Sequence, residues 1–365
     1  MTIRGHRAGP QRRAALILLA AIVATMPASG VTAPALPARP GSAVADRRDG
    51  VDHLYRIIGK VRFLVFWASA DDVGGARITW RGGERDSIVS LLIGSEPQRA
   101  PRQVNEWGYI REEVTDDLTT VFGIRTVTDG DSPEDAEARR TPAGGLAAFG
   151  VLCSTVSPFE ARSMTTTLHV SGEATYRDVD RVLDVSERGA RWTQQHTRRP
   201  SGAAPGFLTA LDEMMRSSAV AAREIDTIPA VPRRAFVYND SVYDLSVRRV
   251  ERVATLQLRS GLFQNLLRTE LSVRDRATGA TTEFRVTYGT EGELAGVPVY
   301  AQYQPNWWFK VELELDRSVD VPADPATDTS IRQRIDSLCG VPPLVTGGCP
   351  GGKPPALVPE LRRLS

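Results

Sequence analysis

The sequence predicts a mainly β protein, built as an antiparallel curved sheet or half-barrel with one or two packed helices. Apolar and polar residues alternate with a period of two along most of the chain, and helical spacing is confined to two stretches. Long, uniformly apolar strands of the kind buried in parallel α/β cores are not found in the sequence. Strands with one buried and one wet face, joined by short turns, favour antiparallel pairing.

The alternation is clearest between residues 307 and 316. One predicted face carries Trp307, Phe309, Val311, Leu313 and Leu315, and the other carries Trp308, Lys310, Glu312, Glu314 and Asp316. Earlier, Val61, Phe63, Val65 and Trp67 follow the same pattern, and the Asp- and Gly-rich segment 71–75 predicts a turn after them. These strands are each expected to bury one face only.

Residues 1–30 have the composition of an export signal. Four arginines precede the apolar run 14–24, which is too short to span a bilayer comfortably, and Ala28-Ser29-Gly30 fits a cleavage site. Ala43-Val44-Ala45 is a second candidate for the cleavage site. The signal predicts a periplasmic or extracellular protein, and residues 31–49 are expected to form a flexible leader.

Two strand-rich blocks are predicted, over residues 50–128 and 146–323, with a loop or linker at 129–145. The second block includes a helix at 206–224, where Phe207, Leu211, Met214 and Met215 have helical spacing. A mostly irregular tail, 324–365, includes a shorter helix at 328–338. The blocks could be two domains or one large sheet, since single all-β domains often reach 200 to 250 residues, and the pattern leaves both open.

Composition and charge fit a folded protein and argue against a nucleic-acid partner. The chain is 41% hydrophobic and 24% charged, with 45 basic and 44 acidic residues. Four of the basic residues belong to the signal, so the mature chain is slightly acidic. It therefore has no excess of positive charge that would attract nucleic acid. The oligomeric state is not indicated.

Three cysteines in an oxidising compartment predict one disulfide and one cysteine left over. Cys339 and Cys349 flank a short turn-rich loop, which makes them the favoured pair. Cys153 lies in an apolar run and is expected to be a buried small residue. Pairing of Cys153 with a cysteine of the tail stays open.

Motifs for catalysis, metals or cofactors are absent from the sequence, which predicts a protein that is not an enzyme and uses no cofactor. The histidines beyond the signal are far apart and accompany no Ser- or Cys-centred motif. Spacings typical of metal sites, such as Cys-x-x-Cys, do not occur.

Aromatic residues on the apolar faces of strands carry the remaining functional signal. In a curved sheet they would line a concavity, which becomes a ligand cavity if its own side chains do not fill it. The predicted lining, with two residues of the helix as a lid, is Trp67, Trp80, Tyr288, Trp307, Phe309, Phe207 and Met214.

The stretch Glu283–Asp316, with its Phe284-Arg285-Val286-Thr287-Tyr288 strand and its Trp307-Trp308-Phe309 sequence, resembles the closing strands of uncharacterised bacterial envelope proteins with a lipoprotein-carrier-like curved sheet. The resemblance implies a half-open barrel that shelters acyl chains under a helical lid, and no functional residue transfers with it. Residues before 130 depart from the compact form of such carriers. The sequence thus predicts an exported protein that binds a lipid or other apolar ligand; the alternative is a non-catalytic structural or interaction module with an envelope protein as partner.

Overall fold

The computed structural model describes residues 51–340 except 64–65, 83–85, 101–102, 117, 127–145, 172, 185–191, 225–232, 307–308, 318–320 and 323–324. The proposed signal and leader, the loop at 129–145 and the tail beyond residue 340 lie outside these residues. Within the described part of the chain, no helix is long and apolar enough to cross a membrane.

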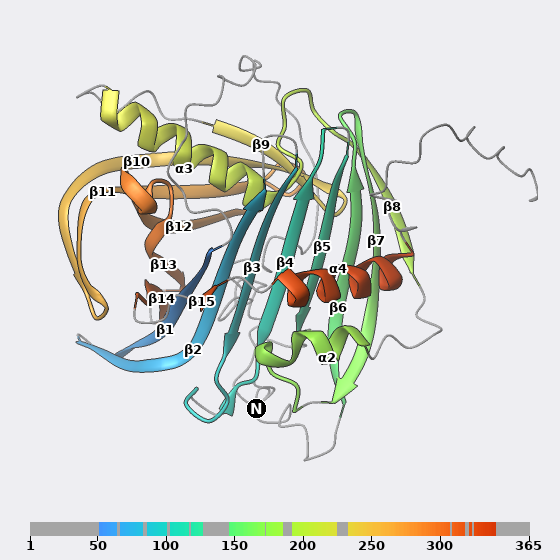
Figure 1. The fold of residues 1–365 in the computed structure, drawn as a ribbon, viewed down its shortest axis with the longest axis horizontal. Coiled ribbons are helices and arrows are strands. Elements are labelled where there is room, and N and C mark those ends of the chain that lie inside the picture. Colours follow the sequence, from blue (N-terminus) through green and yellow to red (C-terminus); the bar gives the residue numbers. More distant parts are fainter. Residues whose placement is uncertain are drawn as a thin grey trace, which may run out of the picture.

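One continuous antiparallel sheet, not closed into a barrel, contains all the strands of the described residues (Figure 1). Its first strands are β1 (Val51–Phe63), β2 (Phe66–Gly82), β3 (Ser87–Ser95), β4 (Trp107–Val114), β5 (Thr119–Thr126), β6 (Leu146–Val156), β7 (Glu160–Ser171) and β8 (Thr193–Arg198). The later strands are β9 (Arg233–Tyr238), β10 (Ser241–Leu258), β11 (Gly261–Asp275), β12 (Thr281–Gly289), β13 (Pro298–Asn306), β14 (Phe309–Leu315) and β15 (Val321–Pro322).

Strand order shows that the two predicted blocks form one sheet. From one edge to the other the order is β8 to β1 and then β14 to β9, so two meanders meet where β1 pairs with β14. This pairing brings Tyr55 opposite Leu315 and Ile57 opposite Leu313. The predicted antiparallel, mainly β fold is therefore confirmed.

The sheet is strongly bent in one half and nearly straight in the other. In the rolled half, which comprises β1, β2 and β9–β14, the long β10–β11 hairpin curves back until its tip reaches β14 and β2 (Figure 1). At that tip, Ser260 Oγ donates to the Leu315 carbonyl and Arg259 lies 3.3 Å from Asp72. The flat half comprises β3–β8.

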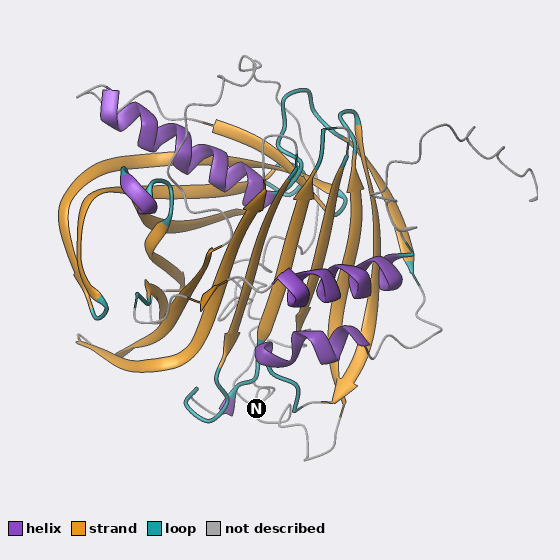
Figure 2. Ribbon diagram, viewed as in Figure 1, coloured by secondary structure: helices purple, strands orange, loops and turns teal. Residues whose placement is uncertain are grey.

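Helix α3 (Phe207–Glu224) covers the inner side of the rolled half, where the spacing predicted a helix at 206–224 (Figure 2). Its apolar side chains join those of β1–β3 and β9–β14 in the larger core. Helix α4 (Pro325–Cys339) begins three residues before the predicted helix 328–338 and lies on the other face of the sheet, over the flat half. Beside α4 lie two short elements that the sequence did not indicate, η2 (Tyr176–Asp178) and α2 (Val179–Asp184). A further short helical turn, η3 (Gly292–Leu294), precedes β13.

Hydrogen bonds to Glu112 of β4 hold the start of α3 against the flat half. The Glu112 carboxylate accepts hydrogen bonds from the backbone N–H groups of Leu208 and Thr209, both at 2.8 Å, and from the Thr209 hydroxyl at 2.6 Å. A Cβ at Gly206 would lie 2.3 Å from Glu112 Cδ, so glycine is required there. A carboxylate at a helix N-terminus satisfies donors that have no partner within the helix and also interacts favourably with the helix dipole.

Strand β9 and the turn after it pack on the same face of the flat half. Ser163 Oγ donates to the Asn239 carbonyl at 2.8 Å, and a Cβ at Gly123 would lie 3.0 Å from the Tyr238 hydroxyl. Burial raises the pKa of Tyr238 to about 12. The flat half is thus covered by the rolled half on one face and by α2 and α4 on the other.

Candidate functional site

Helices α2 and α4 cover only part of their face of the flat half. Val182 and Leu183 of α2, with Ile331 and Ile335 of α4, are buried against apolar residues of β3–β7. The Arg334 side chain of α4 donates to the Asp180 carbonyl of α2. This second core ends where the strands extend past α4, and a pocket of about 600 Å³ lies at that point.

The floor of the pocket consists of two cross-strand rows that the register of β4–β8 places side by side. The inner row is mostly apolar and runs through Arg111, Phe122, Cys153, Met164 and Gln194. The outer row is polar and runs through Glu113, Thr120, Thr155, Arg162 and His196. Because side chains alternate between faces, each strand contributes every second residue to this floor.

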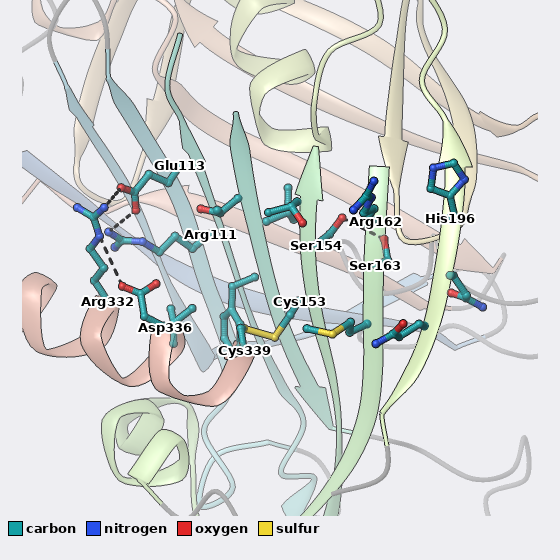
Figure 3. Close-up of a pocket in the computed structure, with 18 residues that line it drawn as sticks. Arg111, Glu113, Cys153, Ser154, Arg162, Ser163, His196, Arg332, Asp336 and Cys339 are labelled. Carbon is teal, nitrogen blue, oxygen red and sulfur yellow. Dashed lines mark hydrogen bonds and ion pairs between the residues drawn. A yellow bond between two sulfur atoms is a disulfide. The ribbon is translucent and has the colours of Figure 1, made fainter. Parts of the chain in front are cut away.

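One wall of the pocket is α4, as Figure 3 shows, and an ion-pair cluster holds this wall against β4. Arg332 of α4 lies 2.8 Å from the Glu113 carboxylate, which is also 3.5 Å from Arg111. The Arg111 side chain is only 4% exposed, so Glu113 compensates a charge that has lost most of its water. Burial raises the pKa of Asp336, and the neighbouring Arg332 and Arg111 counteract this rise.

A second polar group stands at the opposite side, beside the edge strand β8. Glu160 accepts from His196 Nε2 at 2.7 Å and pairs with Arg162 at 2.7 Å. The hydrogen bond from His196 is the main cause that lowers the pKa of Glu160. The side chains of Arg162 and His196 are 73% and 59% exposed, so they can reorient toward a ligand.

A disulfide between Cys153 and Cys339 joins the floor of the pocket to the last residue of α4 (Figure 3). The predicted pair Cys339–Cys349 is therefore wrong, and the structure takes the alternative in which Cys153 pairs with the C-terminal region. Sequence proximity favoured Cys349, whereas the packing of α4 on the sheet brings the Cα atoms of Cys153 and Cys339 to 5.7 Å. Cys349 lies outside the described residues.

The serine hydroxyl groups and the imidazole near the pocket already have hydrogen-bond partners. Ser154 and Ser163 carry their side chains on the opposite face of the sheet, where their hydroxyl groups hydrogen-bond to each other at 3.0 Å and Ser163 also donates to the Asn239 carbonyl. His196 pairs with Glu160 and not with a hydroxyl. Among the described residues, no group of three or more His, Cys, Asp or Glu side chains could hold a metal ion.

The predicted ligand-binding residues fall outside this pocket. Trp80, Tyr288, Phe207 and Met214 come together in the core under α3, and each is less than 5% exposed. The Phe207 ring lies 5.5 Å from that of Phe236 and 6.2 Å from that of Phe284, measured between ring centroids. At these four positions the concave side is filled by the chain itself.

Trp67 and Phe309 lie apart from those four residues, near the end of the β1–β2 hairpin, and Trp307 is outside the described residues. Phe309 packs at the margin of the core. Trp67 pairs with Arg62 and is 38% exposed, on the face opposite to the core. The chain turns between Phe63 and Phe66, so the period of two that placed Trp67 on the apolar face is broken there.

The pocket residues were not identified from the sequence. Arg111, Glu113, Thr155 and Arg162 follow the ordinary alternation of strands with one wet face, and no motif distinguishes them. These residues are recognised only from the register of five paired strands, which places them side by side. No local pattern in a single sequence predicts that register.

Comparisons with known proteins leave the family of this chain open. No family model and no curated protein matches the chain. Among solved structures, a candidate lipoprotein from Parabacteroides distasonis shares 8% identity over 74% of this chain and 95% of its own, with a TM-score of 0.27. A chain solved in work on the in-meso crystallization of membrane proteins shares 9% identity over 78% of this chain and 90% of its own, with a TM-score of 0.21. Likenesses at these TM-scores are weak and carry no functional argument.

Proposed function

We propose that this chain is an exported binding protein that holds a small polar ligand in the pocket between α4 and β4–β8. The observation that carries the proposal is a pocket of about 600 Å³ whose wall is tied to its floor by the Cys153–Cys339 disulfide. Ligand sites of roughly 300 to 1,000 Å³ are usually preformed. The disulfide also supports export, because such bonds persist in oxidising compartments.

The two rows of the floor suggest the chemistry of the ligand. Met164 offers an apolar surface, with the buried Phe122 next to it, and Thr120, Thr155 and Gln194 place hydroxyl and amide groups beside it. A ligand with hydroxyl or amide groups and one apolar side, such as a saccharide or a short peptide, would match this surface. Met164 can adapt its shape to such a ligand because its side chain is flexible.

The test compares ligand retention by a variant with a filled pocket and by a matched control. Thr155→Trp places a large side chain in the outer row, and Thr281→Trp makes the same change at an exposed position of β12. Native mass spectrometry of each protein, purified from its own host, should reveal a bound small molecule on the wild type and on Thr281→Trp only. Thermal-shift assays with monosaccharides, disaccharides and dipeptides provide a second measurement.

The proposal fails if the wild type retains no small molecule and no compound of the panel raises its Tm. That result would favour the structural or interaction module. Equal retention by Thr155→Trp and the wild type would place the ligand elsewhere.

A second candidate is a lipid or other apolar ligand held on the inner side of the rolled half. It is supported by the adjacent Met214 and Met215 of α3, both buried in the larger core and both adaptable in shape. An apolar ligand there would require α3 to move away from the sheet. Recovery of an acyl lipid from the wild type and from Thr155→Trp alike would support this candidate, and its absence from organic extracts of both would exclude it.

A further inference from the structure

Two neighbouring hairpins end at the same corner of the rolled half, away from α4 (Figure 1). In β1–β2 the last paired residues are Phe63 and Phe66, and in β13–β14 they are Asn306 and Phe309. Because β1 pairs with β14, with Val61 opposite Phe309, the two hairpin ends lie side by side. We refer to Lys60, Trp67, Lys310 and Glu312 at this corner as the lysine corner.

The lysine corner has an unusual charge pattern. Lys60 and Lys310 are directly opposite each other on paired strands, an arrangement that costs stability because like charges repel. Both ammonium groups share one carboxylate, Glu312, at 2.7 and 3.0 Å. One positive charge of this group is therefore left without compensation within it.

The choice of lysine at these two positions is itself informative. The chain has 45 basic residues, of which only Lys60, Lys310 and Lys353 are lysines, so two of the three lysines meet at one corner. An ammonium group on a long flexible stem can extend from an apolar surface toward a neighbouring phosphate.

The same corner exposes a large aromatic residue. Trp67 is 38% exposed and is one of three large apolar side chains exposed in the described part of the chain. Lys310 Nζ lies 5.3 Å from the centre of the Trp67 ring. In the sequence, Phe63-Leu64-Val65-Phe66 connects β1 to β2, where short hairpin connections usually contain Asn, Asp or Gly.

We infer that the lysine corner docks on a lipid surface that carries anionic head groups. Trp67 would lie at the level of the head groups, where the amphipathic indole ring is favoured, and Lys60 and Lys310 would contact lipid phosphates. Charge complementarity is the reason for choosing this partner, because an anionic surface supplies the negative charge that the two lysines share incompletely. The pocket is lined by residues of β4–β8 and α4, whereas the lysine corner lies on β1, β2 and β14, further along the sheet, so docking would leave the pocket accessible.

The test is co-sedimentation of the full mature chain with vesicles. Vesicles of phosphatidylglycerol and phosphatidylethanolamine should bind the wild type, and vesicles of phosphatidylcholine alone should bind it much more weakly. Binding should decrease at high salt, because electrostatic attraction to the head groups is screened. Absence of binding to the anionic vesicles, or equal binding to both kinds, would overturn the inference.

Variants distinguish binding through the lysine corner from non-specific adsorption to the vesicles. Trp67→Ser, and the triple variant Lys60→Gln/Lys310→Gln/Glu312→Gln, should each bind the anionic vesicles about fivefold or more weakly. The triple variant removes the carboxylate together with both lysines, so no unpaired buried charge remains, and thermal unfolding confirms that it folds. Lys60→Arg/Lys310→Arg keeps the charge and should bind within about twofold of the wild type.

Phe159→Ser is the matched apolar control, since Phe159 is 79% exposed in the turn between β6 and β7, on the flat half. It should bind vesicles as the wild type does. An equal loss in Phe159→Ser and Trp67→Ser would show non-specific adsorption and would overturn the inference.

Discussion

The rolled half and the flat half are built from strands of the same kind, yet they bury their apolar faces in different ways. In the rolled half, the curvature of the sheet brings strands that are distant in sequence around α3. The apolar side chains of α3 complete the core on the concave side. The flat half does not bend around its helices. Instead, α4 is held on it by a disulfide and ion pairs, and the part of the face beyond α4 stays open.

The difference shows how curvature decides between a core and a pocket. Apolar residues on a bent sheet converge, so Trp80 and Tyr288 meet α3 and leave no room for a ligand at those positions. On the straight part of the sheet, α4 covers only part of the face, and the outer row from Glu113 to His196 forms part of the floor of a pocket.

The largest effect on stability is expected from removal of the disulfide. This change tests how much the stability of the flat half depends on the covalent bond between α4 and the sheet. Cys153→Ala should lower the free energy of unfolding by about 4 kcal/mol, because the bond closes a loop across 186 residues. Urea unfolding followed by circular dichroism measures this change. Cys349→Ser is the control and should leave stability and the disulfide intact; if it removed the disulfide instead, the pairing with Cys339 would belong to Cys349.

The next effect concerns the connection between the halves. Glu112→Ala should lower the free energy of unfolding by about 3 kcal/mol, because three donors at the start of α3, one of them buried and two partly buried, would lose their acceptor. Gly206→Ala should also destabilise the protein although it keeps Glu112, since its Cβ would collide with that carboxylate. Unchanged urea midpoints for both variants would mean that α3 does not depend on this contact.

A smaller effect is expected for the ion pairs that hold α4. Arg332→Ala should lower stability by about 1 kcal/mol, because the Arg332 side chain is 35% exposed and its pair with Glu113 is partly screened. Arg332→Lys keeps a positive charge and should lose less. Chemical denaturation measures the free energy of unfolding of the wild type and both variants. If Arg332→Ala lost as much stability as Cys153→Ala, the ion pairs would hold α4 on the sheet as strongly as the disulfide does.

The smallest effect is a pH dependence at the rim of the pocket. The pKa of Glu160 is held below its ordinary value of 4.5 by His196 and Arg162, so the folded protein favours the carboxylate more than the unfolded chain does. This contribution to stability is present above about pH 4.5 and is lost as the pH falls through the lowered pKa. The difference in stability between the wild type and Glu160→Gln should therefore shrink as the pH is lowered. A difference that grows at low pH would contradict the lowered pKa of Glu160.

The turn between β1 and β2 illustrates what local patterns miss. The segment Asp71–Gly75 has the composition of a turn, yet β2 continues through it, with Asp72 at a φ of 55° and an irregular register opposite Ile57 and Gly59. The chain turns earlier, between Phe63 and Phe66, where every residue is apolar. Turn composition is a local preference, and the pairing of β1 with β2 overrides it.

Strand β14 shows both the strength and the limit of alternation. Val311, Leu313 and Leu315 are buried on one face, as the period of two predicts. The opposite face was expected to be wet, yet Glu312 is only 3% exposed, because Lys60 of the neighbouring strand and Lys310 cover it. The identity of that neighbour follows from sheet order and not from the strand itself.

By itself, the sequence determined the mainly β class, the antiparallel pairing and the position of the helix that became α3, because these depend on periods of two and of about 3.6 residues within one segment. Only the tertiary structure decided that β1 meets β14, that Trp80 and Tyr288 are packed in the core, that Cys153 pairs with Cys339 and that two rows of side chains form a pocket. Each of these depends on which segments lie side by side across long stretches of chain, and that is set by the packing of the whole sheet.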